Sequence, residues 1–253
     1  MYLKCPMLKL MTDAGNRYTK LALFQDKRIV NQTRIKNEDL NRTSVGEWMK
    51  DFERPGYVFV SSVSAREDKL CKLFEEPGVT IFTRSDVKHF PVTIDYLTPQ
   101  TLGFDRIAAA CGAFFLYQGS PLLIIDAGTS MTVDFVDENG VYRGGAISPG
   151  LDMRFRALHE FTERLPLIEP NPTAVATGKS TDGSINAGAY IGMVFEIQGF
   201  INHYELNYKK LKIIMTGGDA ELLQMQLKKT IFAEPNLVLI GLNEILDSQI
   251  ARR

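Results

Sequence analysis

Two short stretches of the sequence carry the same acidic turn, Asp-Ala-Gly, between strand-like runs. The first lies in LMTDAGNRYTKLALF, residues 10–24, and the second in LLIIDAGTSMTVDF, residues 122–135. Glycine lets the backbone adopt φ > 0 and approach a phosphate closely, and the N–H groups of such a turn can form an anion-binding concavity. An aspartate at the strand end can hold a hydrated cation that bridges phosphate oxygens. Two such turns predict a site that grips a polyphosphate chain.

Polar side chains near each acidic turn could add hydrogen bonds to the phosphates. The expected donors are Asn16, Thr19 and Lys20 in the first turn and Thr129, Ser130 and Thr132 in the second. A third glycine turn, in MTGGDAELL (215–223), follows an apolar strand and opens a helix, whose N-terminus favours negative charge. Its Gly-Gly pair would let a flat adenine or ribose lie on the backbone. Together, in this order, the three turns indicate a nucleotide site.

The elements around the turns repeat in the two halves of the chain. In the first half we expect strands within 8–36, 57–63 and 79–84, and helices at 43–53, 65–76 and 103–118. In the second half we expect strands at 122–125, 129–136 and 141–147, a helix at 150–165, a long helix within 180–208, a strand and helix within 211–227, and a closing short strand and helix within 236–253.

This repetition indicates an internal duplication of an α/β unit. Thr19 and Thr132 keep the spacing that separates Asp13 from Asp126, which supports the same alignment. Sequence identity between the halves is otherwise thin. Two unrelated Asp-Gly turns, which are common in β-hairpins, remain the alternative explanation.

The bulk composition excludes several function classes. Lysine and arginine number 29 and aspartate and glutamate 30, so the formal net charge of the 253 residues is −1. No overall field would attract nucleic acid or an anionic membrane, and we expect neither as a partner. Three scattered cysteines, Cys5, Cys71 and Cys111, give no zinc spacing and are typical of a reducing compartment. With no secretory signal and no apolar run near the roughly 18 residues of a membrane helix, we expect a cytoplasmic protein.

The turns and the segments around them resemble a known family. DAGNRYTK resembles the first phosphate motif of the acetate kinase, sugar kinase, Hsp70 and actin superfamily, and LGFDR, DAGTSMTVDF, GGAISPGL and TGGDAELL look like type III pantothenate kinase. The resemblance implies an α/β chain with a duplicated actin-like (ribonuclease H-like) fold, two βββαβα-type halves with a cleft between them. We expect the halves at residues 1–118 and 119–253.

The resemblance also implies an activity. Members phosphorylate pantothenate with ATP to 4'-phosphopantothenate, the first step of coenzyme A biosynthesis. They are homodimers that use Mg²⁺ with ATP and a monovalent cation, K⁺ or NH₄⁺. Two alternatives are a non-catalytic regulatory or binding protein on the same scaffold and another small-molecule phosphotransferase of the superfamily. The lack of a basic helix argues against direct DNA binding, and the GFDR and SPGL segments argue against another acceptor.

Site residues carry over from the family position by position. Asp105 matches the catalytic base, Asp126 the ligand of the monovalent cation, and Asp13 the residue that places Mg²⁺ indirectly. The expected ATP and phosphate contacts are Asp13, Ala14, Gly15, Asn16, Arg17, Tyr18, Thr19, Lys20 and Thr129. The expected substrate contacts are Tyr96, Gly103, Phe104, Asp105, Arg106 and, from the neighbouring subunit, Thr181.

Structural explanations remain open for several of these residues. Asp105 could cap the helix that follows, with Arg106 solvated. Thr181 could cap a helix that begins near Ser184, and this role could coexist with substrate binding. Arg17 stands where the family usually has threonine, so a phosphate hydroxyl donor is lost, and the long cation either substitutes for it or crowds the site. The first seven residues, MYLKCPM, lie outside the family pattern and receive no role.

Overall fold

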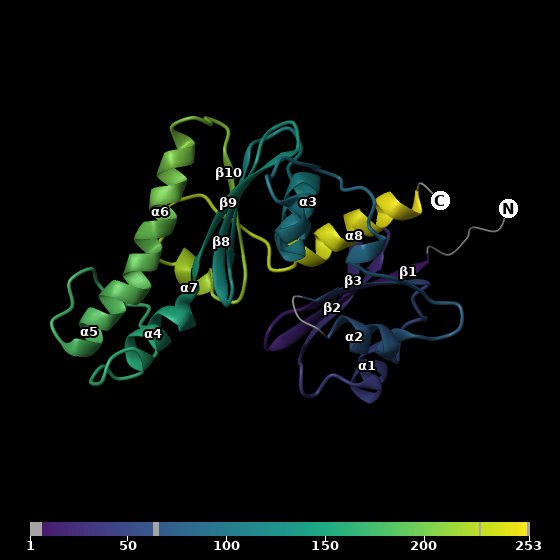
Figure 1. Cartoon of the computed structure of the whole chain (residues 1–253), viewed down its shortest axis with the longest axis horizontal. Helices are drawn as coiled ribbons and strands as arrows, with labels where there is room; N and C mark the ends of the chain where they lie inside the picture. Colours follow the sequence, from purple (N-terminus) through teal and green to yellow (C-terminus); the bar gives the residue numbers. More distant parts are fainter. Residues whose placement is uncertain (1–6, 63–65, 228, 252–253) are drawn as a thin grey trace. The chain divides into compact units, whose positions relative to one another are not determined.

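The structure, a computed structural model, describes residues 7–62, 66–227 and 229–251 (Figure 1). Cys5, most of the N-terminal extension, and the expected strand and helix ends at residues 63 and 65 lie outside these ranges. The chain divides into two compact units. One contains the residues up to 93, residues 97–116 and those from 236 onward, and the other contains residues 94–96 and 117–235.

The first unit is built on a five-stranded sheet in the order β3-β2-β1-β4-β5. Its strands are β1 (Leu8–Ala14), β2 (Tyr18–Gln25), β3 (Arg28–Lys36), β4 (Tyr57–Ser62) and β5 (Thr80–Phe82). β1, β2 and β3 form an antiparallel meander, whereas β4 and β5 run parallel to β1. The meander turns tightly between β2 and β3 at Asp26, whose φ of 52° is a conformation that aspartate tolerates.

Strand alternation gives this sheet two different faces. Leu10, Leu21 and Val60 pack with residues of α1 (Arg42–Met49) and α2 (Glu67–Phe74) on one face. Because successive side chains of a strand point to opposite faces, Asp13 at the end of β1 points to the other one. The carboxylate is therefore kept away from this apolar core.

Two further helices of the first unit, α3 (Phe104–Leu116) and α8 (Leu237–Ile250), pack closely against each other. A Cβ atom at Gly241 would overlap the carbonyl of Ala108, and one at Gly112 would overlap the carbonyl of Leu237. Glycine at these two positions lets the helix backbones approach. The C-terminal helix thus belongs to the first unit, and the expected second half, 119–253, ends earlier, at residue 235.

The second unit carries a six-stranded sheet in the order β11-β10-β7-β8-β9-β6. Its strands are β6 (Thr93–Ile94), β7 (Leu122–Ala127), β8 (Ser130–Val136), β9 (Val141–Pro149), β10 (Lys212–Thr216) and β11 (Phe232–Ala233). Its helices are α4 (Leu151–Glu160), α5 (Thr181–Asn186), a π-helical turn (Ala187–Ile191), α6 (Gly192–Glu205) and α7 (Ala220–Gln224). Helices α4, α6 and α7 lie on one side of this sheet (Figure 1), and their apolar residues form one core with β7, β8 and β10.

The shared strand order confirms the duplicated actin-like fold. In both sheets a three-stranded antiparallel meander is followed by two parallel strands, and β6 is an addition at the edge of the second. The alignment of Thr19 with Thr132 is wrong by one residue, however. Lys20 lies opposite Asp13, whereas Thr132 lies opposite Asp126, because the second turn is one residue shorter.

The start of α8 differs from the prediction. The apolar run that begins at Leu237 was expected to start with a short strand, but it forms the first turns of α8. A short apolar run fits a strand and a buried helix equally well, so its period could not decide between them.

Short 3₁₀ turns lie at Arg84–Asp86 and Pro99–Thr101. Within the residues described, none of the helices is long and apolar enough to pass through a membrane.

Candidate active site

The first acidic turn joins β1 to β2 and presents Asp13 at its edge. The backbone N–H of Gly15 donates to the carbonyl of Tyr18 at 3.0 Å, which closes the turn. Asp13 lies opposite Lys20 in the antiparallel pairing with β2 and beside Ser61 in the parallel pairing with β4. The carboxylate therefore stands at the carboxyl end of a central strand, with a cation directly across from it.

The electrostatics of Asp13 show which charged groups surround it. The pKa of Asp13 is raised to about 6, mainly by burial and in part by the negative charge of Asp105, while Lys20 acts in the opposite direction. Asp105 is distant in sequence, so the fold of the first unit brings these two carboxylates together. Perturbed pKa values of this kind are frequent at functional sites.

Asp105 sits in the first turn of α3, where the chain enters the helix. The carbonyl of Gly103, the residue just before the helix, accepts the first helical bond from the N–H of Ile107 at 3.3 Å. Asp105 Oδ1 accepts from the backbone N–H of Arg106 at 2.9 Å. A Cβ atom at Gly103 would lie only 2.5 Å from the same oxygen, so glycine leaves room for the carboxylate.

The neighbours of Asp105 are more buried than the sequence suggested. Arg106 is only 6% exposed, so the interpretation that it is a solvated arginine is wrong. The ring of Phe104 stacks on that of Phe59, with the ring centroids 5.7 Å apart and an interplanar angle of 7°. Its centroid lies 6.2 Å from that of the Phe90 ring. The side chain of Phe104 thus anchors the start of α3 in the core.

A residue that the sequence did not reveal, Asn37, braces the first turn. Its Nδ2 donates to the carbonyls of Gly15 and Asn16, each at 3.0 Å, and its backbone N–H donates to the carbonyl of Arg17 at 3.0 Å. Its Oδ1 accepts from the hydroxyl of Thr19 at 2.8 Å. Thr19 is 1% exposed, so its hydroxyl serves this brace. The available signal was an asparagine directly after the third strand, a residue type that holds turns.

The remaining residues of the first turn have distinct positions. Ala14 is buried, whereas Asn16 and Arg17 are exposed. The guanidinium of Arg34, on β3, lies 3.9 Å from the centroid of the Tyr18 ring. Arg34 is also the residue opposite Lys20, so the row across β1, β2 and β3 carries one carboxylate and two cations.

The second acidic turn joins β7 to β8 in the second unit. Asp126 is partly buried, opposite Thr132 on β8 and beside Thr216 on β10. The N–H of Gly128 donates to the carbonyl of Ser130 at 3.2 Å and closes the turn. Thr129, at its tip, is exposed. Asp126 thus has a threonine on each of the two adjoining strands, where Asp13 faces lysine.

Two glycines from later segments pack directly on this second turn. A Cβ atom at Gly150 would overlap the carbonyls of Gly128 and Thr129, and one at Gly217, where φ is +98°, would overlap the backbone of Ala127. The N–H of Asp219 also donates to the carbonyl of Ala127 at 3.0 Å. A Cβ atom at Gly218, in contrast, would meet no atom within 4 Å. The first glycine of the pair therefore serves packing, and the second leaves open space.

Tyr96 belongs to the second unit, in a short strap formed by residues 94–96. The N–H of Asp95 donates to the carbonyl of Tyr142 at 3.0 Å, and the rings of Tyr96 and Tyr142 are 6.1 Å apart. Tyr96 is half-buried, whereas the next residue, Leu97, is fully exposed. The expected substrate tyrosine is therefore fixed at the end of an ordered segment.

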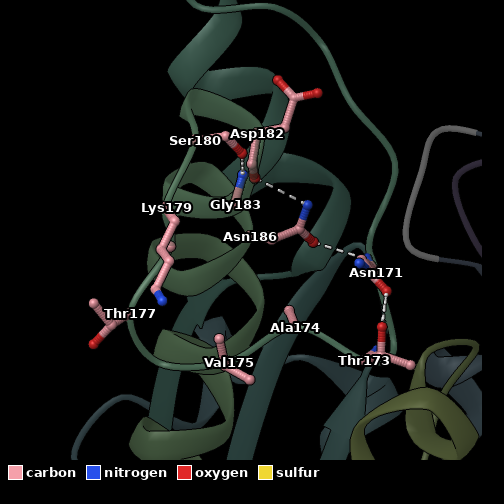
Figure 2. Close-up of a pocket in the computed structure, with 11 residues that line it drawn as sticks. Asn171, Thr173, Ala174, Val175, Thr177, Lys179, Ser180, Asp182, Gly183 and Asn186 are labelled. Carbon is pink, nitrogen blue, oxygen red and sulfur yellow. Dashed lines mark hydrogen bonds between the residues drawn. The ribbon is translucent and has the colours of Figure 1, made fainter.

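Thr181 is the first residue of α5 and is exposed. The helix cap is Ser180, whose Oγ accepts from the N–H of Gly183 at 3.1 Å, so the alternative that Thr181 caps this helix is wrong. An adjoining pocket of about 420 Å³ is lined by Ser180 and Asp182, on either side of Thr181 in the chain. Figure 2 shows these lining residues. Two further lining residues are bonded to each other, since Asn186 Oδ1 accepts from the N–H of Asn171 at 2.7 Å.

The donor groups of each acidic turn suit a hard cation that is also held by a ligand. Among the described residues, no group of three or more histidine, cysteine, aspartate or glutamate side chains could hold a metal ion. Mg²⁺ commonly binds through one or two carboxylates, waters and substrate phosphates, so a single carboxylate such as Asp13 fits it. Asp126, with Thr132 and Thr216 beside it, offers oxygen donors to a cation as well.

The family profile and the curated relatives agree on one family. The profile of type III pantothenate kinase matches residues 9–203. The type III pantothenate kinase of Christiangramia forsetii is 39% identical over 95% of this chain and 98% of its own, and that of Cytophaga hutchinsonii is 39% identical over 96% and 100%. The crystal structure of a Baf family protein from Campylobacter jejuni superposes with a TM-score of 0.64 at 18% identity, covering 96% of this chain and 99% of its own. The structural likeness supports the fold.

Proposed function

Because the chain belongs to the type III pantothenate kinase family, we propose that it transfers the γ-phosphoryl group of ATP to the primary hydroxyl of pantothenate. The product is 4'-phosphopantothenate, and the reaction is the first step of coenzyme A biosynthesis. The observation that carries this proposal is the electrostatic coupling of Asp105 to Asp13. A base for the acceptor hydroxyl and an acidic residue for the phosphates then act next to each other.

In this proposal Asp105 is the general base. Phosphoryl transfer needs little covalent help from the protein, but the attacking hydroxyl must be aimed in line and must lose a proton. Asp105 Oδ1 is held by the N–H of Arg106, which fixes the orientation of the carboxylate toward the substrate hydroxyl. The guanidinium of Arg106, positioned at a buried site, holds the pantothenate carboxylate or a phosphate oxygen, because its fork suits planar oxyanions.

The first turn binds the phosphates of ATP in this proposal. The Gly15 turn supplies backbone N–H groups, and Lys20 supplies a positive charge. Asp13 holds Mg²⁺ through water, and the ion, when bound, neutralises charge on the phosphates. Support for this role is the raised pKa of Asp13, because a partly buried carboxylate is costly to ionise and a nearby cation stabilises its charge. Arg17, exposed at the tip, takes the place of the usual hydroxyl donor.

The second unit contributes the other ligands. Asp126 holds the monovalent cation, K⁺ or NH₄⁺, and Thr129 contacts ATP. The open space beside Gly218 accepts the adenosine. Tyr96 contacts pantothenate, and Thr181 of a neighbouring subunit completes its site, so the protein acts as a homodimer. The free thiols Cys71 and Cys111 support an assignment to the cytoplasm, where thiols stay reduced.

One assay tests the proposed function. The protein is incubated with ATP, MgCl₂, KCl and pantothenate, and phosphopantothenate is measured by mass spectrometry. We expect product formation that depends on all four components. A folded protein that forms no product above background would leave a regulatory or binding role on the same scaffold. Product from a different small alcohol, with pantothenate inert, would assign another phosphotransferase activity.

A further inference from the structure

The segment that carries Tyr96 is tied to the second unit by one arginine. Arg143, on β9, donates from Nη1 to Asp95 Oδ2 at 2.6 Å, and Asp95 directly precedes Tyr96. The same guanidinium donates from Nε and Nη2 to Asp137 Oδ2, at 3.0 and 2.8 Å. The guanidinium of Arg143 thus joins residues 94–96 to the hairpin between β8 and β9.

The anchor of this guanidinium is itself rigid. Asp137 Oδ1 accepts from the backbone N–H groups of Asn139 and Val141, at 3.0 and 2.9 Å, inside the hairpin turn. Asp137 is 7% exposed. Burial acts to raise the pKa of Asp137, but the bonds from Val141 and Arg143 outweigh it and keep this pKa below the usual range. Arg143 is therefore held on one side by a fixed, ionised partner.

The ring of Tyr96 rests on a matching surface of β9. At Gly144, with φ at +97°, a Cβ atom would lie 3.5 Å from two ring carbons of Tyr96. The neighbouring ring, that of Tyr142, is buried and donates its hydroxyl to Asp134 Oδ1 at 2.7 Å. The ring of Tyr96 thus packs on β9, and Arg143 holds the side chain of the residue that precedes it.

We propose that Arg143 is a positioning residue for pantothenate, which acts through Asp95 to hold Tyr96 in its substrate-binding orientation. This inference rests on the proposed function and deepens it, since it names the group that sets the affinity for the acceptor. The side chains of Arg143 and Asp95 are 47% and 63% exposed. An exposed ion pair contributes little to folding stability, so its effect should appear in substrate binding.

The experiment compares Arg143→Gln and Arg143→Lys with wild type and with Arg54→Gln. Arg54 forms an exposed ion pair with Glu76 at 3.0 Å in the first unit and serves as the matched control. For Arg143→Gln we expect the KM for pantothenate to rise about fivefold to twentyfold, because a loosened contact group must be ordered on binding. The KM for ATP, kcat and Tm should stay near wild type. Lysine keeps the charge but loses the fork, so its KM should be intermediate.

A double variant separates positioning from a general structural effect. With Tyr96→Ala, the group that Arg143 positions is absent, so adding Arg143→Gln should raise the KM for pantothenate no further. An unchanged KM in Arg143→Gln, an equal rise in the KM for ATP, or additive effects in the double variant would overturn the proposal.

A measurement without substrate keeps this inference separable from the proposed function. In wild type the amide of Asp95 is bonded to the carbonyl of Tyr142 and should exchange slowly with deuterium. Arg143→Gln should speed exchange in a peptide that spans residues 93–98, while Arg54→Gln should not. Unchanged exchange overturns the inference, even if the wild type proves to phosphorylate another acceptor. Faster exchange in a protein inactive toward pantothenate rejects the function alone and leaves the tie intact.

Discussion

Asp13 lies directly opposite Lys20 in the pairing of β1 with β2, yet burial still raises the pKa of its carboxyl to about 6. The equivalent carboxylate of the second unit, Asp126, lies opposite Thr132. An aspartate therefore faces a lysine across the first turn, and an aspartate faces a threonine across the second. This difference supports separate roles for the two turns, with Mg²⁺ and phosphates at the first and a monovalent cation at the second.

The raised pKa of Asp13 predicts a conflict between stability and function. The folded protein binds this proton more tightly than the unfolded chain, so the contribution is unfavourable above about pH 6 and absent below about pH 4. A rise of about two pH units corresponds to up to about 3 kcal/mol. We expect Asp13→Asn to raise the Tm of the ligand-free protein at pH 7.5 and to change it little at pH 4, while abolishing turnover.

The check is thermal unfolding of both proteins across this pH range. Comparing the difference between them removes the effects of other titrating groups. A stabilisation by Asp13→Asn that is the same at both pH values would contradict the raised pKa. Retained turnover would contradict the role of Asp13 with the phosphates.

Asp105→Asn tests the base. The substitution keeps the size and the bond from the N–H of Arg106 but removes the proton acceptor, so kcat should fall about 10²- to 10⁴-fold. The KM values should change little. Asp68→Asn, in the first turn of α2, makes the same change at another helix start and should leave kcat unchanged. Wild-type turnover in Asp105→Asn would assign the residue to helix capping alone.

The sequence predicted the two antiparallel meanders and the acidic turns because both rest on local signals. Alternating apolar residues and Asp-Gly turns mark a meander, and a repeat of the pattern marks a duplication. The registers could not be predicted, since a turn shorter by one residue shifts every partner across the ladder. Lys20 rather than Thr19 therefore faces Asp13.

Packing at a distance was also beyond the sequence. The assignment of α8 to the first unit depends on the close approach of Gly112 and Gly241, which are remote from each other in the chain. The burial of Arg106 and the brace formed by Asn37 depend on neighbours that only the folded chain supplies. The roles proposed for Asp105, Asp126, Tyr96 and Thr181 stay predictions until they are measured.

Asn37→Ala tests the brace of the first turn. The change removes the bonds to the carbonyls of Gly15 and Asn16 and leaves the hydroxyl of Thr19 without its acceptor. A looser turn should raise the KM for ATP about tenfold, the equivalent of one lost hydrogen bond, with the KM for pantothenate unchanged. Asn31→Ala, on β3, removes a bond to the carbonyl of Trp48 away from the turn and is the control. Equal values of the KM for ATP in the two variants would leave Asn37 a purely structural residue.

Asp126→Ala tests the monovalent cation site. Without the carboxylate, the initial rate of phosphorylation should no longer rise with K⁺ at constant ionic strength. It should stay at the rate that the wild type shows without K⁺. Glu138→Gln, at the exposed hairpin of the same sheet, removes a negative charge without touching the turn and should keep full activation. Initial rates measured against K⁺ concentration, with choline as the balancing cation, distinguish the two. Unchanged activation in Asp126→Ala would show that the cation binds elsewhere.

The glycine pair at positions 217 and 218 gives two opposite predictions from one turn. Gly217→Ala forces a Cβ atom into the backbone of Ala127 at a positive φ, so it should lower the free energy of unfolding by about 2 kcal/mol or more. Gly218→Ala enters open space and should leave Tm within a few degrees. Because the proposed function places adenosine against Gly218, the Gly218→Ala variant should also raise the KM for ATP severalfold. Denaturant unfolding and the KM for ATP, measured on both variants, separate the packing glycine from the binding glycine. A normal KM for ATP in Gly218→Ala would move the adenosine away from this turn.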